Sequence, residues 1–480
     1  MNRLFNDRIS PRVQIFIPVL LFLFALSLRL VGLEKGLWYD EYASIRVATA
    51  PDFIERLQRY NTPPTYHAAL RVWMQFYESE NFLRLFSVIF GMLSLAALWK
   101  LVSKYGRLAG NLTLLVAATS LLLVRYSLEI RAYAMLMLAT ALTLFTADLV
   151  RRNSGRKYQL YLCLALCFAV AVHTVGVFLI PSVIAFLFCS SPSKRWRKWA
   201  LWYAPPAILF GFLFLSLYAP HVGTSWWTPP LTWSHAKAIV SDSLGWIGME
   251  NIWFKRYVLC CAGIMTLWGY WKRSLPFAIA ALVYLFGIIL TSQFAINIFL
   301  PRTLVPLWTI GAVFVGVHVS DLPHRWLRRF VIVGLIAFSL FSSKLWVQFG
   351  DDLPSGRFRT AITELRNQWR DGDFLIVYPF YLKRQGIGSY YGHLEWKDIF
   401  IVPHEDVYTD PIQEHIETRV RHQRRRQGFA NFYFLKWKPI ERHSEKEFMT
   451  WLLNTYGPPQ TLIEDSVSLY RFSDPASLSD

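Results

Sequence analysis

The chain has 480 residues, of which 54% are hydrophobic and only 17% carry a charge, whereas soluble domains average roughly 25%. Apolar runs of about 15 to 22 residues recur along it, each close to the roughly 20 residues needed to cross a bilayer. This composition excludes a soluble globular protein and predicts an α-helical polytopic membrane protein. All five cysteines lie within apolar runs, so neither a disulfide framework nor a cysteine-based metal site is expected.

The formal net charge of +18 is distributed unevenly. From residue 347 onward the chain has 17 Lys and Arg against 19 Asp and Glu, which leaves 33 basic and 13 acidic residues before that point. These basic residues cluster in short loops between apolar runs, as the positive-inside rule predicts for cytoplasmic loops. The charge therefore orients the protein in the bilayer, and no nucleic-acid partner is predicted.

The loop charges also set the expected topology. Arg3, Arg8 and Arg12 precede the first apolar run, which is too long for a signal peptide and is interpreted as a retained span. We therefore expect an integral plasma (inner) membrane protein with a cytoplasmic N-terminus and an extracytoplasmic C-terminal domain. About eleven spans satisfy the basic loops, near residues 13–33, 82–101, 108–124, 132–150, 158–172, 175–189, 200–219, 257–271, 275–292, 303–319 and 330–346.

Residues 1–346 are expected to form the transmembrane domain, with an outer loop at 34–80 between the first two spans. In this loop, Tyr42–Tyr60 and Thr65–Tyr77 mix arginines with large apolar residues, which predicts helices that lie in the membrane interface. Residues 347–480 change period and predict a small α/β domain. Its expected strands are Phe374–Tyr378, Ile399–Val402, Ala430–Leu435 and Ser468–Phe472, and its expected helices lie near 357–370, 381–391, 411–426 and 444–455.

Three segments on the expected outer side gather ionisable residues. Asp40-Glu41 follows the first span, the segment from Arg125 to Arg131 follows the third, and Arg302 precedes the tenth. His67 and His173 are expected at a similar depth. Each residue alone has a structural explanation, because interfacial arginines extend toward lipid phosphates and Glu129 can pair with Arg131. Ionisable groups near membrane depth are costly, so their collection on one side predicts a functional site.

Several of these segments resemble a known family. Trp38-Tyr39-Asp40-Glu41, Thr62-Pro63-Pro64-Thr65-Tyr66-His67, Arg84-Leu85-Phe86-Ser87-Val88 and Tyr126-Ser127-Leu128-Glu129-Ile130-Arg131-Ala132-Tyr133 are similar to the opening of polytopic GT-C glycosyltransferases. The type they resemble uses dolichyl- or polyprenyl-phosphate mannose and includes protein O-mannosyltransferases and aminoarabinose transferases. The resemblance covers residues 13–200 well and the later spans loosely.

The resemblance implies a fold, an activity and a site. The fold would be a helical GT-C membrane domain with a small C-terminal α/β domain, and the activity would be transfer of a sugar from a polyprenyl-phosphate carrier to an extracytoplasmic lipid, glycan or protein. By resemblance, Asp40 is the general base of an inverting displacement, and Glu41 supports it or orients the acceptor. Arg131, with Arg125 or Arg302, would bind the phosphate.

The remaining candidates follow the same resemblance. Glu129 would hold Arg131, while His67 and His173 would contact the phosphate or a metal. Some GT-C enzymes use a divalent ion and others do not; two adjacent carboxylates and a distant histidine do not define a ligand set. No cofactor is therefore certain from the sequence, and a divalent metal ion stays an open alternative.

Two other classes of protein compete with the enzyme. A transporter of polyprenyl-linked lipid or glycan would carry polar groups near the middle of the membrane and internal repeats, and the sequence has few such charges and no clear repeat. A non-catalytic subunit for assembly of envelope polymers would tolerate loss of Asp40, whereas an enzyme would not.

Overall fold

The chain divides into two compact units in this computed structural model. The first consists of Met1–Leu33 and Ser44–Gln348, and the second of Glu34–Ala43 and Phe349–Asp480. The structure describes residues 11–33, 37, 39–59, 63–153, 155–190, 202–218, 231–243, 260, 263, 271–349, 357–370, 373–378, 399–401, 414, 416–418, 420, 421, 425, 431–437, 443–464 and 467–473.

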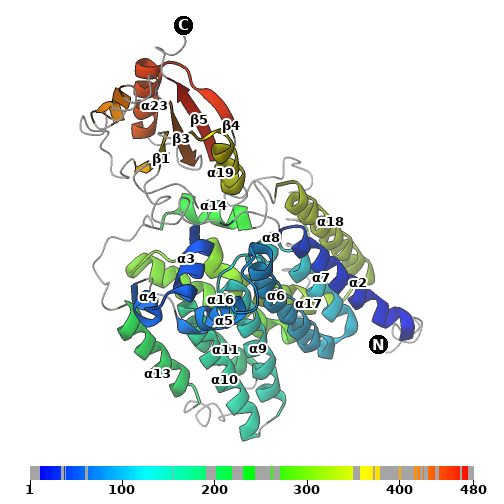
Figure 1. The fold of residues 1–480 in the computed structure, drawn as a ribbon. Coiled ribbons are helices and arrows are strands. Elements are labelled where there is room, and N and C mark those ends of the chain that lie inside the picture. The colour runs from blue at the N-terminus through cyan, green and yellow to red at the C-terminus, as the bar shows by residue number, and fades with distance from the viewer. Residues whose placement is uncertain are drawn as a thin grey trace. The chain divides into compact units, whose positions relative to one another are not determined.

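The first unit is built from helices (Figure 1). Their apolar side chains face either the interior or the outer surface of the bundle, as expected when both neighbouring helices and lipid are apolar. Its helices include α2 (Pro11–Leu30), α6 (Glu80–Val102), α7 (Arg107–Thr119), the short α8 (Leu121–Tyr126), α9 (Tyr133–Arg152), α10 (Arg156–Val172), α11 (Leu179–Ser190), α13 (Ala204–Leu213), α16 (Trp271–Phe294), α17 (Val305–Ser320) and α18 (Arg325–Phe349), with α14 (Trp233–Ser243) between α13 and α16.

Within the described residues, five helical stretches are long and apolar enough to cross a membrane. They are Glu80–Tyr105, Tyr133–Arg152, Trp271–Phe294, Pro301–Ser320 and Arg325–Val347, and the shorter apolar helices are Phe16–Leu30, Thr174–Ser190 and Ala204–Leu217. Each overlaps a span predicted from the sequence. The predicted span at 257–271 lies almost wholly outside the described residues, so the count of eleven stays a prediction.

The third predicted span is interrupted. Helix α7 ends at Thr119 and α8 begins at Leu121, because Ser120 adopts an extended conformation with ψ of 117°. The expectation of one continuous helix over 108–124 was therefore wrong. Apolar periodicity continues through Ser120, so the sequence pattern did not reveal the break. Helix α8 leads directly into the segment 125–131.

Helices α7 and α17 approach each other closely at Gly316. A Cβ atom at this position would overlap Thr113 Oγ1 and would lie 2.7 Å from the carbonyl oxygen of Ala109. Small residues allow such backbone contact between membrane helices, where close packing replaces the hydrophobic effect as the source of association.

A buried carboxylate ties together the helix ends opposite the 125–131 segment. Asp148 is fully buried, and it accepts hydrogen bonds from Tyr105 Oη at 2.8 Å and from Arg151 Nη2 at 2.6 Å. Arg152 Nε donates to its other oxygen at 2.7 Å. Arg273, at the start of α16, donates to the Tyr105 carbonyl and forms an ion pair of 2.9 Å with Asp321.

Short helices follow the first span. The stretch predicted as one helix over Tyr42–Tyr60 is divided into α3 (Tyr39–Thr49) and α4 (Phe53–Arg59), and α5 (Pro64–Met74) occupies the second predicted stretch. Arg71 of α5 donates to the carbonyl of Ala50 at 2.9 Å, which joins α5 to the C-terminal end of α3.

The C-terminal part of the second unit contains a five-stranded sheet in the order β2-β1-β3-β5-β4. The strands are β1 (Phe374–Tyr378), β2 (Ile399–Ile401), β3 (Asn431–Trp437), β4 (Gln460–Glu464) and β5 (Val467–Ser473), and the helices are α19 (Arg357–Gln368) and α23 (His443–Tyr456). Strands β1, β2 and β3 are parallel, whereas β5 is antiparallel to both β3 and β4. The four predicted strands are confirmed, and β4 was not predicted.

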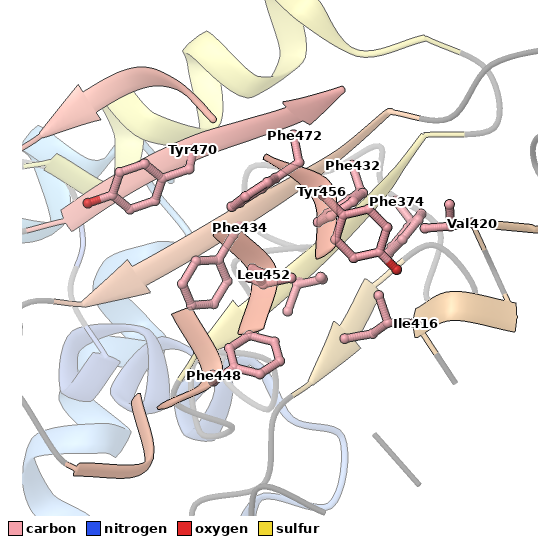
Figure 2. Close-up of a cluster of buried hydrophobic side chains, with 11 residues drawn as sticks. Phe374, Ile416, Val420, Phe432, Phe434, Phe448, Leu452, Tyr456, Tyr470 and Phe472 are labelled. Carbon is pink, nitrogen blue, oxygen red and sulfur yellow. The ribbon is translucent and has the colours of Figure 1, made fainter. Parts of the chain in front are cut away.

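Alternation of side chains along the strands produces two cores, one on each face of the sheet. Phe432 and Phe434 of β3 face α23 and pack with Phe448 and Leu452 of that helix (Figure 2). Tyr433 and Leu435 face α19, where the core also contains Ala361, Ile362, Leu365, Leu375, Val377 and Leu469. The sheet is thus covered by a helix on both faces, which confirms the predicted α/β class of this region. The predicted helix at 381–391 lies outside the described residues.

Candidate active site

Helix α3 carries the two candidate carboxylates in its first turn. Asp40 is partly exposed, whereas Glu41 and Ser44 are each 1% exposed. Acidic side chains in a first turn interact favourably with the helix dipole. Residues three and four apart are neighbours on a helix surface, so Ser44 lies one turn beyond both carboxylates. The boundary between the two units falls after Ala43, and α3 is continuous across it.

Arg131 is held against this helix. Its Nη1 donates to Ser44 Oγ at 3.2 Å, and its guanidinium lies 5.7 Å from the centre of the Tyr133 ring. The hydrogen bond and the contact with the aromatic ring together orient the planar guanidinium of this partly buried arginine. Sequence reasoning named Arg131 but did not find Ser44, because a lone serine on an amphipathic helix carries no distinctive signal.

Glu129 forms an ion pair with Arg125, with 3.1 Å between Glu129 Oε1 and Arg125 Nε. The sequence had assigned Glu129 to Arg131. Spacing by four residues across the end of α8 brings Arg125 and Glu129 onto one side of the turn. The carbonyl of Glu129 accepts a hydrogen bond of 2.6 Å from Ser87 of α6, which anchors the segment to the bundle.

His67 is buried in α5 beside Arg131. Its Nδ1 lies 3.4 Å from the carbonyl oxygen of Pro63. A carbonyl only accepts, so Nδ1 carries the proton and Nε2 presents a lone pair. Among the described residues, Nε2 has no hydrogen-bond partner. Burial, and then the charge of Arg131, lower the pKa of His67 to about 3, so the ring is neutral at physiological pH.

His173 has the opposite arrangement of donor and acceptor. It follows α10, and its Nδ1 accepts a hydrogen bond of 3.3 Å from the Val175 amide. The neutral ring therefore carries its proton on Nε2. Burial lowers the pKa of His173 to about 3, with smaller contributions from the charges of Arg131 and Arg302. The Tyr133 ring lies 5.6 Å from the imidazole, centre to centre.

Arg302 reaches the same region from a distant part of the chain. It lies in the short helix Pro301–Leu304, which is fixed by hydrogen bonds from Thr303 Oγ1 to Ile298 O at 2.6 Å and from Tyr284 Oη to Thr303 O at 2.8 Å. Burial raises the pKa of Tyr126 well above its usual value, with smaller effects from charged neighbours that include Arg125 and Arg302. Tyr126 and Tyr133 stack edge to face at 4.9 Å.

The tertiary structure thus brings six of the predicted site residues together around Tyr126 and Tyr133, although they lie up to 235 positions apart in the chain. These six are His67, Arg125, Glu129, Arg131, His173 and Arg302. Sequence reasoning quoted Tyr126 and Tyr133 only as part of a motif. As to a metal, no group of three or more His, Cys, Asp or Glu side chains capable of holding one occurs in the portion of the chain that the structure describes.

A unit of helices, several of them apolar and long enough to cross a membrane, and a small α/β region define the class of protein, a helical polytopic membrane protein with a C-terminal α/β region. A family model described as dolichyl-phosphate-mannose-protein mannosyltransferase matches residues 61–223. This part of the chain contains every candidate residue except Asp40, Glu41 and Arg302.

Two crystal structures of one protein are similar to this chain. The chain is similar to ArnT from Cupriavidus metallidurans, both in the apo state and bound to undecaprenyl phosphate. In each case the TM-score is 0.57 at 14% identity, and the alignment covers 96% of this chain and 98% of that chain. This likeness concerns the fold. No curated protein gives a significant sequence match. The predicted resemblance to GT-C glycosyltransferases is thereby confirmed.

Proposed function

We propose that this protein is an integral inner-membrane glycosyltransferase. It moves a sugar from a polyprenyl-phosphate carrier to an acceptor on the extracytoplasmic side, by a single displacement that inverts the anomeric carbon. The observation that carries this proposal is the collection of Arg131, Arg302 and His173 within the helical unit, because the charges of both arginines act on this imidazole and would also attract a phosphate. The family match and the ArnT-like fold support the same class of reaction.

In the proposed reaction, the acceptor hydroxyl attacks the anomeric carbon and its proton passes to Asp40. A bond forms between the acceptor oxygen and the anomeric carbon, while the bond between that carbon and the phosphate oxygen breaks. The electron pair leaves with the phosphate, so the polyprenyl phosphate gains the negative charge. The protein must therefore supply a base on one side of the sugar and positive charge on the other.

Asp40 is the better base of the two carboxylates because it is partly exposed, whereas Glu41 is buried. A proton acceptor must come within hydrogen-bond reach of the acceptor hydroxyl. Glu41 is assigned the supporting role of holding the first turn of α3. Adjacent residues on a helix point about 100° apart, which fits one catalytic and one structural carboxylate.

Arg131 and Arg302 are proposed to bind the phosphate, since a guanidinium fork matches phosphate oxygens in two-point contacts. Both lie near His173, whose protonated Nε2 is suited to donate a further hydrogen bond to a phosphate oxygen. Arg125 is paired with Glu129 and would contribute charge at longer range.

His67 takes a different part from the one suggested by the sequence. Because its Nε2 is an acceptor, its lone pair would oppose a phosphate oxygen and would suit a hydroxyl of the sugar or of the acceptor. His67 is therefore proposed to orient a hydroxyl group, and His173 to bind the phosphate.

The test is transfer from radiolabelled polyprenyl-phosphate sugars in membranes, with lipid, glycan and protein acceptors offered separately. Asp40→Asn should bind the donor and lose transfer by at least a thousandfold, because removing a base costs that order of rate. Glu41→Gln serves as the matched control and should retain measurable transfer. A stable Asp40→Asn protein with wild-type activity would refute the mechanism.

The topology can be tested separately. The proposal places the N-terminus in the cytoplasm, and residues 347–480 as a domain on the extracytoplasmic side. A reporter fused after residue 480 should be active only in the periplasm or outside the cell. A cytoplasmic signal would contradict the eleven-span arrangement and the side assigned to the site.

A further inference from the structure

A charged side chain that the proposed reaction does not use lies inside the first span. Arg29, in the last turn of α2, is completely buried. Its Nη1 donates to the Ala25 carbonyl of its own helix at 2.9 Å and approaches the Ala118 carbonyl of α7 at 3.4 Å. Among the described residues, Nε and Nη2 have no hydrogen-bond partner.

Burying Arg29 in this way does not help the protein to fold. Removing a guanidinium from water carries a penalty of several kcal/mol that only good partners offset, and apolar replacements of buried ions are often neutral or stabilising. A leucine or methionine would fill the same space more cheaply. An ionisable residue at membrane depth is therefore a candidate for function.

The Ala118 carbonyl lies where the helical ladder is interrupted. Helix α7 ends at Thr119 and α8 starts at Leu121, and the Ser120 amide is the last one to donate into α7, at 3.0 Å to the Val116 carbonyl. The Ala118 carbonyl lies beyond this point, where helix carbonyls lose their regular amide partners. A guanidinium that donates to one of these carbonyls acts as a cap for the break. The direction of α8 depends on this break, and α8 delivers the segment 125–131.

The same junction contacts that segment directly. A Cβ atom on Gly91 of α6 would lie 2.7 Å from Ser127 Oγ and 3.5 Å from Arg29 Nε, so both side chains pack over the bare backbone of this glycine. A Cβ atom on Gly32, just after α2, would lie 2.5 Å from Leu128 Cδ1. Ser127 therefore packs against α6, and Leu128 packs against the end of the first span.

We propose that Arg29 is a positioning residue, which caps the break between α7 and α8 and packs at Gly91 so that the segment 125–131 presents Arg131 to the donor phosphate. The proposal rests on the proposed function for its effect on the donor, and on the geometry of the junction for its effect on the segment. Arg29 does not touch the substrate.

The first test compares Arg29→Met, which keeps an unbranched apolar side chain without the guanidinium, with Arg29→Lys. In the full-length protein in detergent, Arg29→Met should retain or raise the unfolding temperature. It should weaken binding of undecaprenyl phosphate at least tenfold, since small displacements in a site cost up to about a hundredfold. Arg29→Lys should recover most of the affinity. Arg152→Met, at the opposite end of α9, should lower the unfolding temperature and leave the affinity unchanged.

The second test asks whether Arg29 acts through Arg131. In an Arg131→Ala background, Arg29→Met should produce little further loss of affinity, because residues that act as a unit are not additive. Full additivity, or wild-type affinity in Arg29→Met, would overturn the proposal. Loss of affinity in proportion to a lowered unfolding temperature would reduce Arg29 to a structural role and would also overturn it.

A third measurement separates this inference from the function. Hydrogen–deuterium exchange of amides 125–131 should accelerate at least tenfold in Arg29→Met, while exchange in α10 stays unchanged. If the wild-type protein binds no undecaprenyl phosphate and transfers no sugar, the proposed function fails even when this acceleration is found. If exchange does not change, the positioning role fails even when transfer is confirmed.

Discussion

Arg131 donates a hydrogen bond of 3.2 Å to Ser44, a residue 87 positions earlier in the chain. The bond connects the segment between α8 and α9 with α3, one turn after Asp40. Both residues belong to the helical unit, so this contact fixes the guanidinium of Arg131 within that unit.

Replacing Arg131 should separate charge from geometry. Arg131→Lys keeps the positive charge but loses the planar fork, so kcat/KM for the lipid donor should fall at least tenfold. Ser44→Ala leaves the fork and removes one contact of about 1 kcal/mol, so a fall of about fivefold is expected. Steady-state transfer kinetics measure both effects. Thr140→Ala, which removes a hydroxyl bonded within α9, should leave kcat/KM unchanged, and equal losses in all three variants would contradict the prediction.

The two histidines should give a defined dependence of stability on pH. The pKa of each is lowered from 6.5 to about 3 by burial and neighbouring positive charge. Between these values the unfolded chain binds more protons than the folded chain. The free energy of unfolding should therefore fall as pH drops from about 6.5 toward 3, by about 1.4 kcal/mol per unit for each histidine.

Thermal unfolding of the purified protein between pH 4 and 8 measures this slope. His67→Gln and His173→Gln should each make the slope shallower, whereas Thr140→Ala, which removes no titratable group, should not. Since both rings are neutral above pH 5, their ionisation should not change the rate of sugar transfer between pH 6 and 8. A change of rate near pH 6.5 that disappears in either variant would show that the ring ionises in the working enzyme.

Two glycines on α17 form a matched pair. Gly316→Ala places a methyl group against Thr113 and Ala109, whereas Gly311→Ala meets no atom within 4 Å. Overpacking should lower the stability of Gly316→Ala by about 1–3 kcal/mol. Gly311→Ala should be neutral or gain up to about 1 kcal/mol of helix propensity. Unfolding temperatures in the same detergent compare them, and similar values would show that α7 and α17 do not pack as described.

Asp373 should make the C-terminal sheet less stable at high pH. The residue is 1% exposed, and burial raises the pKa of its carboxyl group to about 6, although a 3.0 Å hydrogen bond from the Arg370 amide and nearby arginines act in the opposite direction. The folded state therefore binds more protons than the unfolded state between pH 3.8 and about 6, and stability is lost as pH rises through this window.

Asp373→Asn keeps an oxygen that accepts from Arg370 and removes the charge. In the full-length protein, amides of β1 should exchange hydrogen more slowly in this variant than in the wild type at pH 8, after correction for the intrinsic rate. At pH 4, where the wild-type carboxyl is protonated, the two proteins should exchange alike. Slower exchange in the wild type than in Asp373→Asn at pH 8 would contradict the prediction. It would show that hydrogen bonds and nearby positive charges offset the cost of burying the ionised carboxylate.

The strands of the C-terminal region show what local pattern can predict. Phe374–Tyr378 was bounded correctly to the residue, because a short apolar run between polar segments has few alternatives. Gln460–Glu464 was missed, since its pattern is weak and it forms a strand by pairing with β5 at the edge of the sheet. The break at Ser120 was missed for the converse reason: the apolar pattern continues through it, whereas the backbone of Ser120 is extended.

The sequence by itself determined the membrane class, the positions of most helices, the α/β character of the tail and the set of candidate site residues. These follow from composition, periodicity and motif, which are properties of neighbouring residues. Only the tertiary structure decided that Glu129 pairs with Arg125, that Ser44 receives Arg131, that the two imidazoles carry their protons on opposite nitrogens and that Arg29 is buried beside Gly91. Each of these depends on which distant groups share a buried space, and burial sets both hydrogen-bond partners and protonation.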